Sequence, residues 1–598
     1  MAQVHTMTTL AVSTPSIEPL RVTVLQVGYP LPKAEYVLLW VQQDVRARCN
    51  HALEYAIMEA NRLHLPVLAC YGLCETFPGA SERAFAFLLQ GLQDLEAELR
   101  KRGIRLVCKK GRPPMVVQEF AQGAALVVTD CGYTRICRQW RQEIVEKLPG
   151  MRCVQVETNV VVPIGVASSI AEPAAATLRP KIHRWLKRFL QPVCESVVAC
   201  PGPDIQLEDG LEKSLFNVQN ADEALAALSV DRSVPRLALW YGGSAAGQKR
   251  LSDFIPRLSS YGTGKANDPS VQGNSFLSPY LHFGHLSPID IALQVRASAQ
   301  NTNAAIAAGT GRSGVEAFLE ELIVRRELAR NFCYFCSSYD SMECLPVWAR
   351  ASLEQHKHDP RPAQYSDIQL VRGETDDACW NAAQWEMVAS GHMHNYMRMY
   401  WCKQILLWGS NPANALKLAM QLNDTYSLDG RDENGYMGIA WCFGLHDRPF
   451  PERPIFGEIR PMTRKGLEGK FNMQRYKDVV RRKCREALRA EPRLRELLPD
   501  AAFGGENGPS AGLTVIFMAQ KQVRQESQQE SGHEAEGAEK CKIADTYGES
   551  ALKRSNEPLG CAAKKQRVIA ATSCIKKAKA VEGKTLHLFF SSRAGSVG

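Results

Sequence analysis

Residues 36–48 read YVLLWVQQDVRAR, an unbroken apolar run that is followed at once by a polar segment. Four further apolar runs rich in strand-forming residues follow along the chain, at 66–70, 104–108, 125–130 and 153–158. Strands that are apolar on both faces are typical of a parallel sheet that helices cover on both sides. The sequence therefore predicts an α/β fold for this part of the chain.

The segments between these runs carry a helical period. The clearest segment has five apolar side chains at spacings of three and four, which places them on one helix face: Phe85, Leu88, Leu92, Leu95 and Leu99. Lys101 and Arg102 follow, and then Gly103. Basic residues in a last turn and a glycine after it predict that the helix ends there.

The composition changes several times along the rest of the chain. Repeated Pro, Ala and Ser indicate a long connection with some helix, whereas the aromatic-rich, helix-period region after it predicts an all-α domain. A tail rich in Gly, Ser, Gln, Glu and Lys is expected to be disordered. The first residues lack the arginines of a transit peptide, which favours a disordered arm. The predicted division is an arm at 1–20, an α/β domain at 21–165, a connection at 166–256, a helical domain at 257–499 and a tail at 500–598.

Charge and cysteine content narrow the class of protein. The net charge of +9 has the sign that a nucleic-acid partner requires, but it is modest for 598 residues, so a merely basic surface stays open. The 19 cysteines are scattered, which predicts a reduced intracellular protein. Cys333 and Cys336 have no second pair at zinc spacing, and we expect no metal site. No apolar run is long enough to span a bilayer.

Polar and aromatic residues gather in four segments of the helical region: 274–288 (NSFLSPYLHFGHLSP), 318–332 (FLEELIVRRELARNF), 391–408 (GHMHNYMRMYWCKQILLW) and 422–443 (LNDTYSLDGRDENGYMGIAWCF). Ser275 and Ser278 could hold a phosphate if a helix starts there, or could simply cap that helix. The G-x-G-x-x-G at 309–314 follows no strand, so we expect a surface loop rather than a dinucleotide site.

Helical spacing brings together further candidate residues in these segments. Glu321 lies four residues before Arg325, which is the spacing of a surface ion pair, although the flanking apolar residues indicate partial burial. Trp401 and Trp408 are seven apart and share a helix face, as core fillers or as an electron relay. The sequence contains no nucleophile elbow, P-loop or zinc-protease helix. A helical domain with many polar and aromatic residues but none of these catalytic motifs indicates that a cofactor supplies the chemistry.

Taken in order, these segments resemble the class II photolyases of the DNA photolyase/cryptochrome family. The resemblance covers about residues 21–498 and rests on LSPYLHFG, FLEELIVRREL, HNYMRMYW and NDTYSLDGRDENGY, with residues 36–48 and 138–140 (RQW) in the α/β domain. It implies a Rossmann-like N-terminal domain and a helical C-terminal domain that holds FAD in a folded form. The implied activity is light-driven repair of cyclobutane pyrimidine dimers in UV-damaged DNA, in which excited FADH⁻ donates an electron to a lesion flipped out of the duplex.

The resemblance also implies roles for individual residues. Those around the flavin would be Tyr261, Ser275, Phe276, Leu277, Ser278, Arg325, Asn395, Arg398, Asp429, Asp432 and Asn434, with Arg398 pairing with Asp429. Glu321 would hydrogen-bond the damaged bases, Asn423 would lie near the flavin N5, and Trp401 with Trp380 would form the photoreduction pair. A pKa raised by burial would suit Glu321. The DNA and lesion contacts would be Lys265, Met399, Trp441, Arg448, Arg460 and Phe450, where the family usually has an indole.

Partners and location are read mainly from the tail. Residues 553–567 resemble a bipartite nuclear import signal, and Gly583–Phe590 (GKTLHLFF) resembles a box that binds a sliding clamp, although its leading glutamine is replaced by Gly583. We expect a nuclear monomer, with organellar targeting left open. The resemblance leaves the antenna chromophore open between a deazaflavin and none. The alternative function is a cryptochrome-like blue-light photoreceptor on the same fold.

Overall fold

The structure is a computed structural model, and it describes residues 17–30, 33–261, 267–271, 273–301 and 314–504. All of these residues belong to one compact unit, residues 1–524. Lys265, the loop predicted at 309–314, the import signal and the clamp-binding box lie outside the described residues, apart from Gly314. Among the described helices, none combines the length and the hydropathy needed to cross a membrane.

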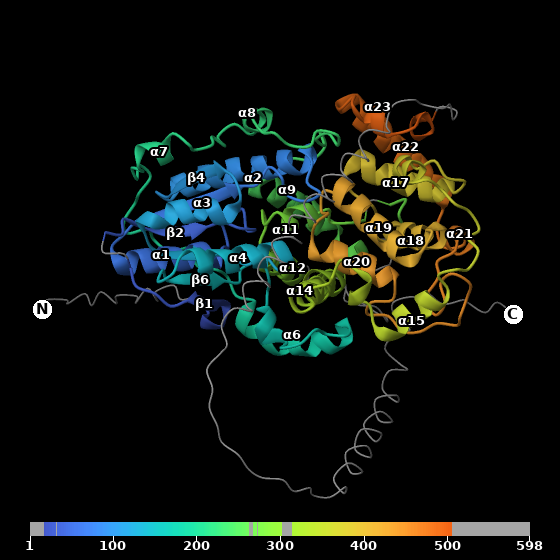
Figure 1. The fold of residues 1–598 in the computed structure, drawn as a ribbon, viewed down its shortest axis with the longest axis horizontal. Helices are drawn as coiled ribbons and strands as arrows, with labels where there is room; N and C mark the ends of the chain where they lie inside the picture. The colour runs from blue at the N-terminus through green and yellow to red at the C-terminus, as the bar shows by residue number, and fades with distance from the viewer. Residues whose placement is uncertain (1–16, 31–32, 262–266, 272, 302–313, 505–598) are drawn as a thin grey trace, which may run out of the picture. The chain divides into compact units, whose positions relative to one another are not determined.

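The N-terminal part is a six-stranded sheet with helices on both faces, as the apolar strands predict (Figure 1). Its strand order is β1-β6-β5-β2-β3-β4, and all neighbours are parallel except β1 and β6. The strands are β1 (Val22–Gln26), β2 (Tyr36–Trp40), β3 (Val67–Leu73), β4 (Arg105–Lys110), β5 (Ala124–Thr129) and β6 (Cys153–Val156). The helices between them are α1 (His51–Leu63), α2 (Glu82–Lys101), α3 (Pro113–Phe120) and α4 (Arg135–Lys147).

The central position of β2 in the sheet explains why the sequence of this strand is apolar throughout. Val37 and Leu39 pack into a core with α1 and α2, whereas Leu38 and Trp40 pack on the opposite face with α3 and α4. All five residues of β2 are at most 3% exposed. The predicted helix is α2, and Gly103 follows its end with a φ of +74°, which a side chain would strain.

A long connection leads from the sheet to the helical part. It contains α5 (Ile164–Ala167), α6 (Ala175–Phe189), α7 (Asp209–Glu212), α8 (Ala221–Ala226) and α9 (Ser244–Phe254). The Phe216 amide donates to the Cys108 carbonyl at 2.7 Å, and Gly202 bridges to Ile104, so this connection covers the edge strand β4. A covered edge cannot pair with another chain.

The C-terminal part is helical, and its described residues contain no strand. The helices are α10 (Leu258–Tyr261), α11 (Ser278–His282), α12 (Pro288–Asn301), α13 (Gly314–Leu319), α14 (Arg326–Phe335), α15 (Val347–Gln355), α16 (Asp367–Arg372), α17 (Ala378–Ser390), α18 (Asn395–Trp408), α19 (Pro412–Tyr426), α20 (Glu433–Cys442), α21 (Arg464–Glu468), α22 (Met473–Ala490) and α23 (Leu494–Leu497). A π-helical segment, Glu320–Arg325, lies between α13 and α14. Buried side chains of α17, α18, α19 and α20 form a large core.

The ordered part of the chain begins before the predicted end of the N-terminal arm and continues a few residues past the predicted start of the tail. Pro19–Arg21 form a 3-10 helix, and the Arg21 guanidinium is buried and donates to the carbonyls of Val160 and Val161. At the other end, Asp500–Phe503 form a 3-10 helix that packs on α22. Tertiary hydrogen bonds and packing at these two ends have no local sequence pattern.

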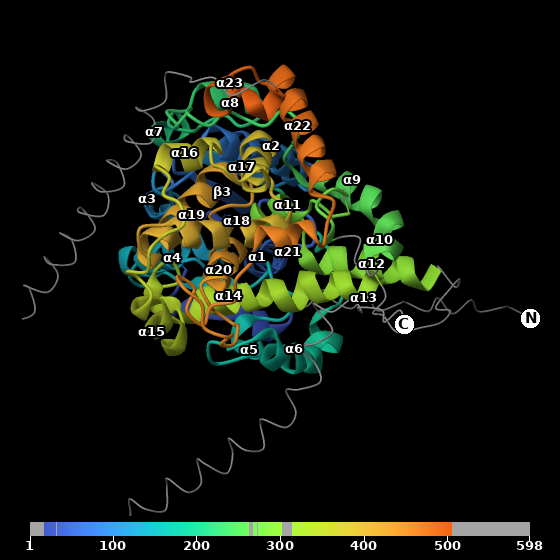
Figure 2. The same ribbon diagram turned by 90° about the vertical axis from the view of Figure 1, so that its right-hand side faces the viewer.

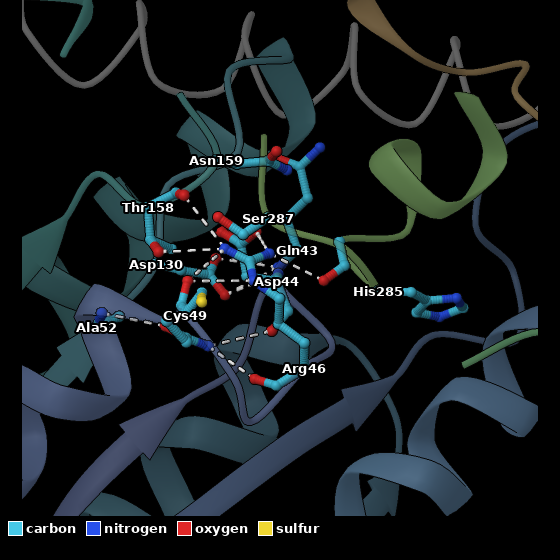
Figure 3. A network of polar contacts seen from close by, with 12 residues as sticks. Gln43, Asp44, Arg46, Cys49, Ala52, Asp130, Thr158, Asn159, His285 and Ser287 are labelled. Atoms are coloured by element: carbon cyan, nitrogen blue, oxygen red, sulfur yellow. Dashed lines mark hydrogen bonds and ion pairs between the residues drawn. The ribbon is translucent and has the colours of Figure 1, made fainter. Parts of the chain in front are cut away.

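The polar segment after β2 joins the sheet to the helical part (Figure 3). Asp130 accepts hydrogen bonds from the amides of Gln42, Gln43 and Asp44 at 3.0–3.1 Å. Arg46 forms a buried ion pair with Asp44 and donates to the Gly284 carbonyl, 2.9 Å away in the loop after α11. This network fixes the position of α11, which carries several of the candidate site residues.

Arg83 makes a second connection between the two parts. This arginine of α2 is 1% exposed and donates to the carbonyls of Tyr426, Val388 and Pro235, at 2.6, 2.9 and 3.3 Å. Replacing Arg83 with methionine is expected to lower the free energy of unfolding by at least about 3 kcal/mol, because three buried carbonyls lose their donor. Chemical denaturation measures this change. The matched variant Arg100→Met alters an exposed arginine of the same helix and is expected to change stability little; equal effects of the two variants would contradict the account.

Candidate functional site

Three of the predicted site residues meet around the Arg398 guanidinium. Arg398 lies in the first turn of α18, and its side chain is 16% exposed. It donates to the Asn423 Oδ1 at 3.1 Å and to the Asp429 Oδ1 at 3.3 Å. Asn423 is buried in the last turn of α19, which ends at Tyr426, and Asp429 follows in the loop before α20. The Arg398–Asp429 pair expected from the resemblance is therefore present.

The charges around this pair hold Asp429 ionised. Burial raises the pKa of the Asp429 carboxyl, but the charge of Arg398 and a hydrogen bond from Ser278 more than offset it, so the pKa lies below its ordinary value. Burial lowers the pKa of the neighbouring His392 to about 4, although Glu386 acts in the opposite direction. At neutral pH this site therefore holds one arginine cation, one carboxylate and a neutral imidazole.

The segment predicted to bind phosphate lies beside this cluster. Ser278 begins α11, is exposed, and reaches Asp429 with its hydroxyl. Ser275 accepts a hydrogen bond from the Leu277 amide, and Phe276 has a φ of +57°, which is unusual for a residue with a side chain. Strained backbone of this kind is common at functional sites. The Phe276 ring lies 4.9 Å from the His392 ring.

Asp432 and Asn434 differ in what they offer a ligand. Asp432 is buried and caps α20, and its Oδ1 accepts from the Asn434 amide at 2.7 Å. Its Oδ2 lies 3.3 Å from the His282 Nδ1. Burial raises the pKa of Asp432, but the His282 hydrogen bond and the Arg330 charge outweigh it, so the pKa falls well below its ordinary value. Both carboxylate oxygens of Asp432 thus have partners within the protein, whereas the Asn434 and Asn395 side chains are exposed.

The two glutamates before α14 have different environments. Glu320 is buried and pairs with Arg179 at 2.6 Å and with Arg325 at 3.6 Å, whereas Glu321 is exposed. Arg325 thus lies within ion-pair distance of Glu320, and the partial burial that the flanking apolar residues indicate belongs to Glu320, whereas Glu321 is exposed. The reason is the π-helical geometry, which aligns residues five apart instead of four and so brings Arg325 to Glu320.

Tyr261 packs beside the π-helical segment. Burial raises the pKa of Tyr261 above its ordinary value, and the Glu321 carboxylate adds to this shift. The Tyr261 ring also packs against Phe318 and Phe254 with ring centres 5.7 and 5.8 Å apart. Tyr261 thus packs against α13, which leads into the segment that carries Glu321 and Arg325.

The tryptophans form a continuous aromatic chain. The Trp401 and Trp380 rings are stacked, with centres 6.3 Å apart and planes within 6°, and Trp380 meets Trp408 at 5.4 Å. Trp401 and Trp380 are fully buried, and Trp408 contacts the half-buried Tyr365 at 5.0 Å. The Trp401 Nε1 donates to Gln384 at 2.9 Å. The chain runs from Trp401, one turn after Arg398 on α18, to a tyrosine at the surface.

The predicted lesion contacts in the described part of the chain lie on α18, on α20 and in the loop after α20. Trp441 and Met399 are half-buried, and the Arg460 guanidinium lies 5.8 Å from the Trp441 ring and 4.3 Å from the Phe450 ring. Arg460 also makes two hydrogen bonds of 3.0 Å to Asp447, so much of its charge is compensated within the protein. Arg448 is exposed, 5.5 Å from the Phe450 ring.

The residues of this region fit the FAD that the resemblance implies. Hydroxyls at Ser275 and Ser278 suit a phosphate, and the Arg398 guanidinium with the exposed Asn395 and Asn434 suits the polar edge of a heterocycle. The buried His392 Nδ1 has no hydrogen-bond partner among the described residues. A buried polar atom normally has a partner, and a bound ligand or an ordered water would supply it here.

Several residues that contact the candidate site residues could not be identified from any sequence pattern. Glu320, Arg179, Gln384 and His392 are polar residues whose roles depend on tertiary contacts. His282 belongs to a quoted segment, but only its contact with Asp432 shows its role. The one local signal that reasoning from the sequence could have used is the pair of adjacent glutamates on an apolar helix, where one of the two must be compensated.

Known proteins match this chain over most of its length. The model of the DNA photolyase family matches residues 37–199. A deoxyribodipyrimidine photo-lyase of Methanothermobacter thermautotrophicus is 41% identical over 75% of this chain and 95% of its own length. Relatives of the same name from Arabidopsis thaliana and Potorous tridactylus are 36% and 35% identical, over 78% and 75% of this chain and 94% and 82% of their own lengths.

Solved structures share the fold at lower identity. A bacterial class III photolyase from Agrobacterium tumefaciens superposes with a TM-score of 0.57 at 18% identity, over 82% of this chain and 99% of its own. An archaeal photolyase from Sulfolobus tokodaii, solved with two FAD molecules, gives 0.55 at 16% identity, over the same shares of the two chains. With a fold of this kind, and with relatives more than one-third identical over nearly their whole lengths, the chain belongs to the DNA photolyase family.

Proposed function

We propose that this chain is a class II deoxyribodipyrimidine photo-lyase, which uses light and reduced FAD to repair cyclobutane pyrimidine dimers in UV-damaged DNA. The observation that carries the proposal is the arrangement on α18, where Arg398 and Trp401 lie one helical turn apart. The candidate flavin site therefore adjoins the stacked tryptophan pair. The activity in the names of the relatives supports the same function.

The protein would hold the cofactor from both ends. Ser275 and Ser278 bind its phosphates, and Arg398, Asn395 and Asn423 face the flavin ring. When bound and reduced, FAD supplies the lesion with an electron on absorbing light and takes it back when the ring has opened. Asp429 fixes the orientation of Arg398 through the 3.3 Å contact, and the arginine charge favours an anionic flavin.

The lesion would lie between Glu321 and the aromatic residues of α20 and its loop. Met399 and Trp441 pack against the extruded bases, and Phe450 lies beside them. Glu321 donates a hydrogen bond to a pyrimidine carbonyl. Because Glu321 is exposed in the protein alone, it is the incoming DNA that buries this carboxyl, and burial raises a carboxyl pKa and favours the protonated, donating form.

The DNA backbone contributes affinity and position rather than selectivity. Arg448 is exposed and available for a phosphate, whereas the Asp447-bound Arg460 orients the rings of Trp441 and Phe450. Flipping the dimer costs a few kcal/mol, and less at a damaged site than at an intact pair. The weakened pairing at the lesion therefore provides part of the selectivity.

Replacing Glu321 tests its role at the lesion. Glu321→Ala is expected to lower repair per absorbed photon about tenfold, because a hydrogen bond worth about 1–3 kcal/mol is lost. Glu321→Gln is expected to retain more activity, because its amide can still donate. Repair is measured with saturating dimer DNA and chemically reduced protein. Glu316→Gln, an exposed position five residues earlier, is the control; an alanine variant that repairs at the wild-type rate would refute the role.

The function itself is tested with dimer-containing DNA and reduced protein, in near-UV or blue light and in the dark. The proposal expects repair in light alone. Repair in the dark would contradict it, and so would its absence in light. A cryptochrome-like photoreceptor, the alternative favoured by a Cryptochrome-1 of Erithacus rubecula that is 27% identical over 41% of its length, would reduce its flavin in light without repairing DNA.

The tail supports two further proposals that rest on sequence alone. Residues 553–567 would direct the chain to the nucleus, and Gly583–Phe590 would bind a sliding clamp. Deleting residues 584–590 and measuring clamp affinity tests the second proposal, and unchanged binding would end it. We propose a monomer, and an antenna that is either a deazaflavin or lacking.

A further inference from the structure

Positive charge is concentrated in one short part of the chain. Residues 464–495 contain twelve Arg and Lys against four Asp and Glu, a net charge of +8, compared with +9 for all 598 residues. The rest of the chain is therefore almost neutral. Such an asymmetry indicates a binding surface for a polyanion, because unpaired like charges repel one another unless a counter-charge covers them.

The arrangement of α22 turns this charge outward. One face of the helix, with Met473, Tyr476, Val480, Cys484 and Ala487, is buried against the core. Arg475, Arg482 and Arg489 lie seven residues apart on the opposite face and are exposed, with Arg485 beside them. We call these four arginines the α22 basic face. Successive arginines at this spacing are about 10 Å apart along the helix axis.

The α22 basic face is not neutralised by the protein. None of its four arginines forms an ion pair with any residue in the described part of the chain, and the one side-chain contact among them is from Arg485 to the Phe503 carbonyl, at 3.3 Å. Two other basic residues of the same helix are compensated. Lys483 pairs with the buried Glu386 at 2.7 Å, and Arg481 lies 3.6 Å from Asp478. Apart from the half-buried Lys477, the uncompensated charge of α22 thus lies on the outward face.

This face starts next to the candidate flavin site. Lys470 and Phe471, which lie between α21 and α22, both contact Tyr396, with the Lys470 Nζ 4.5 Å from its ring centre and the Phe471 ring at 4.8 Å. Tyr396 is the second residue of α18, two positions before Arg398. In Figures 1 and 2, α21 lies beside α18, and α22 extends away from it.

We propose that the α22 basic face binds the phosphate backbone of the DNA that flanks the lesion. The inference rests on the proposed function, which makes DNA the substrate. The eighteen residues of α22 span about 27 Å, which corresponds to about eight base pairs of duplex. A dimer flipped at the site would leave a duplex arm long enough to follow the helix. Arginines suit this role because their guanidinium groups bind phosphate at two points.

The test uses the full chain with three of these arginines replaced, as Arg475→Gln, Arg482→Gln and Arg489→Gln together. Glutamine keeps helix propensity close to that of arginine. Binding is measured over a series of salt concentrations, with a duplex of about twenty base pairs carrying a central dimer and with a dimer-containing pentanucleotide. At about 0.1 M salt, the duplex is expected to bind at least tenfold more weakly, and the slope of log affinity against log salt to fall in magnitude by about 3. Binding of the pentanucleotide is expected to stay unchanged.

A matched variant controls for the overall loss of charge. Arg62→Gln, Arg100→Gln and Lys213→Gln together remove the same charge from exposed positions of the α/β part and the connection, and wild-type binding is expected. Equal slopes for wild type and the α22 variant would overturn the proposal, as would an equal loss in both variants. If wild type fails to repair the pentanucleotide in light, the proposed function fails instead. An acidic protein as the true partner would also leave the duplex slope unchanged.

Discussion

Trp401→Phe is expected to abolish light-driven reduction of the bound flavin. The Trp401 ring is the member of the aromatic chain closest in sequence to Arg398, and it stacks on Trp380 at 6.3 Å. Phenylalanine fills part of the volume but is far harder to oxidise than an indole, so the path to Trp408 is broken. The measurement is flavin absorbance during illumination with an external reductant that replenishes the tryptophans.

Chemically reduced Trp401→Phe protein should still repair dimers, because repair returns the electron and does not draw on the relay. Trp385→Phe is the matched control. Trp385 is a buried tryptophan of α17, but its indole N–H donates to the Arg372 carbonyl and its ring lies outside the stack. Normal photoreduction by the Trp401 variant would show that the stacked pair is ordinary core packing.

Arg398→Ala is expected to weaken flavin binding by about 3 kcal/mol, which is more than a hundredfold in Kd. The substitution removes a cation that faces the flavin, and it leaves the Asp429 carboxylate and the Asn423 carbonyl without their shared donor. The FAD affinity of Arg398→Lys is expected to lie between those of wild type and Arg398→Ala, because lysine keeps the charge but lacks the planar guanidinium that reaches both partners.

Fluorescence titration of the apoprotein with FAD measures this loss, and far-UV circular dichroism confirms that the variant is folded. Lys417→Ala changes an exposed residue of α19 and should bind FAD as wild type does. If Arg398→Ala retains wild-type affinity, then Arg398 serves only to join α18 to the loop before α20.

Much of the α/β part follows from local pattern. Five of the six strands coincide with the predicted apolar runs within a few residues. Burial on both faces accounts for the apolar central strands, whereas the edge strand β4 is buried only at Val107 and Cys108 and ends in two lysines. The exception is β1, which forms the antiparallel edge of the sheet and is partly exposed. A half-exposed edge strand of five residues has no apolar run, and its pairing with β6 is a contact of residues more than one hundred positions apart.

Some contacts among the candidate site residues could be predicted from the sequence, and others could not. The Arg398–Asp429 pair and the contact of Trp401 with Trp380 agree with the expectations. The contact of Arg325 with Glu320, five residues before it, has no signal in the sequence, because a π-helical segment cannot be recognised from residue types. Asp432 caps α20 and lies 3.3 Å from the His282 Nδ1, two contacts that the residue types alone did not reveal. Backbone geometry and the other available partners decide which of these side chains contact one another, and neither can be read from the sequence of one segment.

The central claim is that the helical part binds FAD beside the tryptophan chain. The most direct measurement is the absorption spectrum of the purified full chain, before and after incubation with excess FAD and removal of free ligand. The account predicts a flavin spectrum at about one FAD per chain. A polypeptide that is colourless and stays colourless after incubation would contradict it.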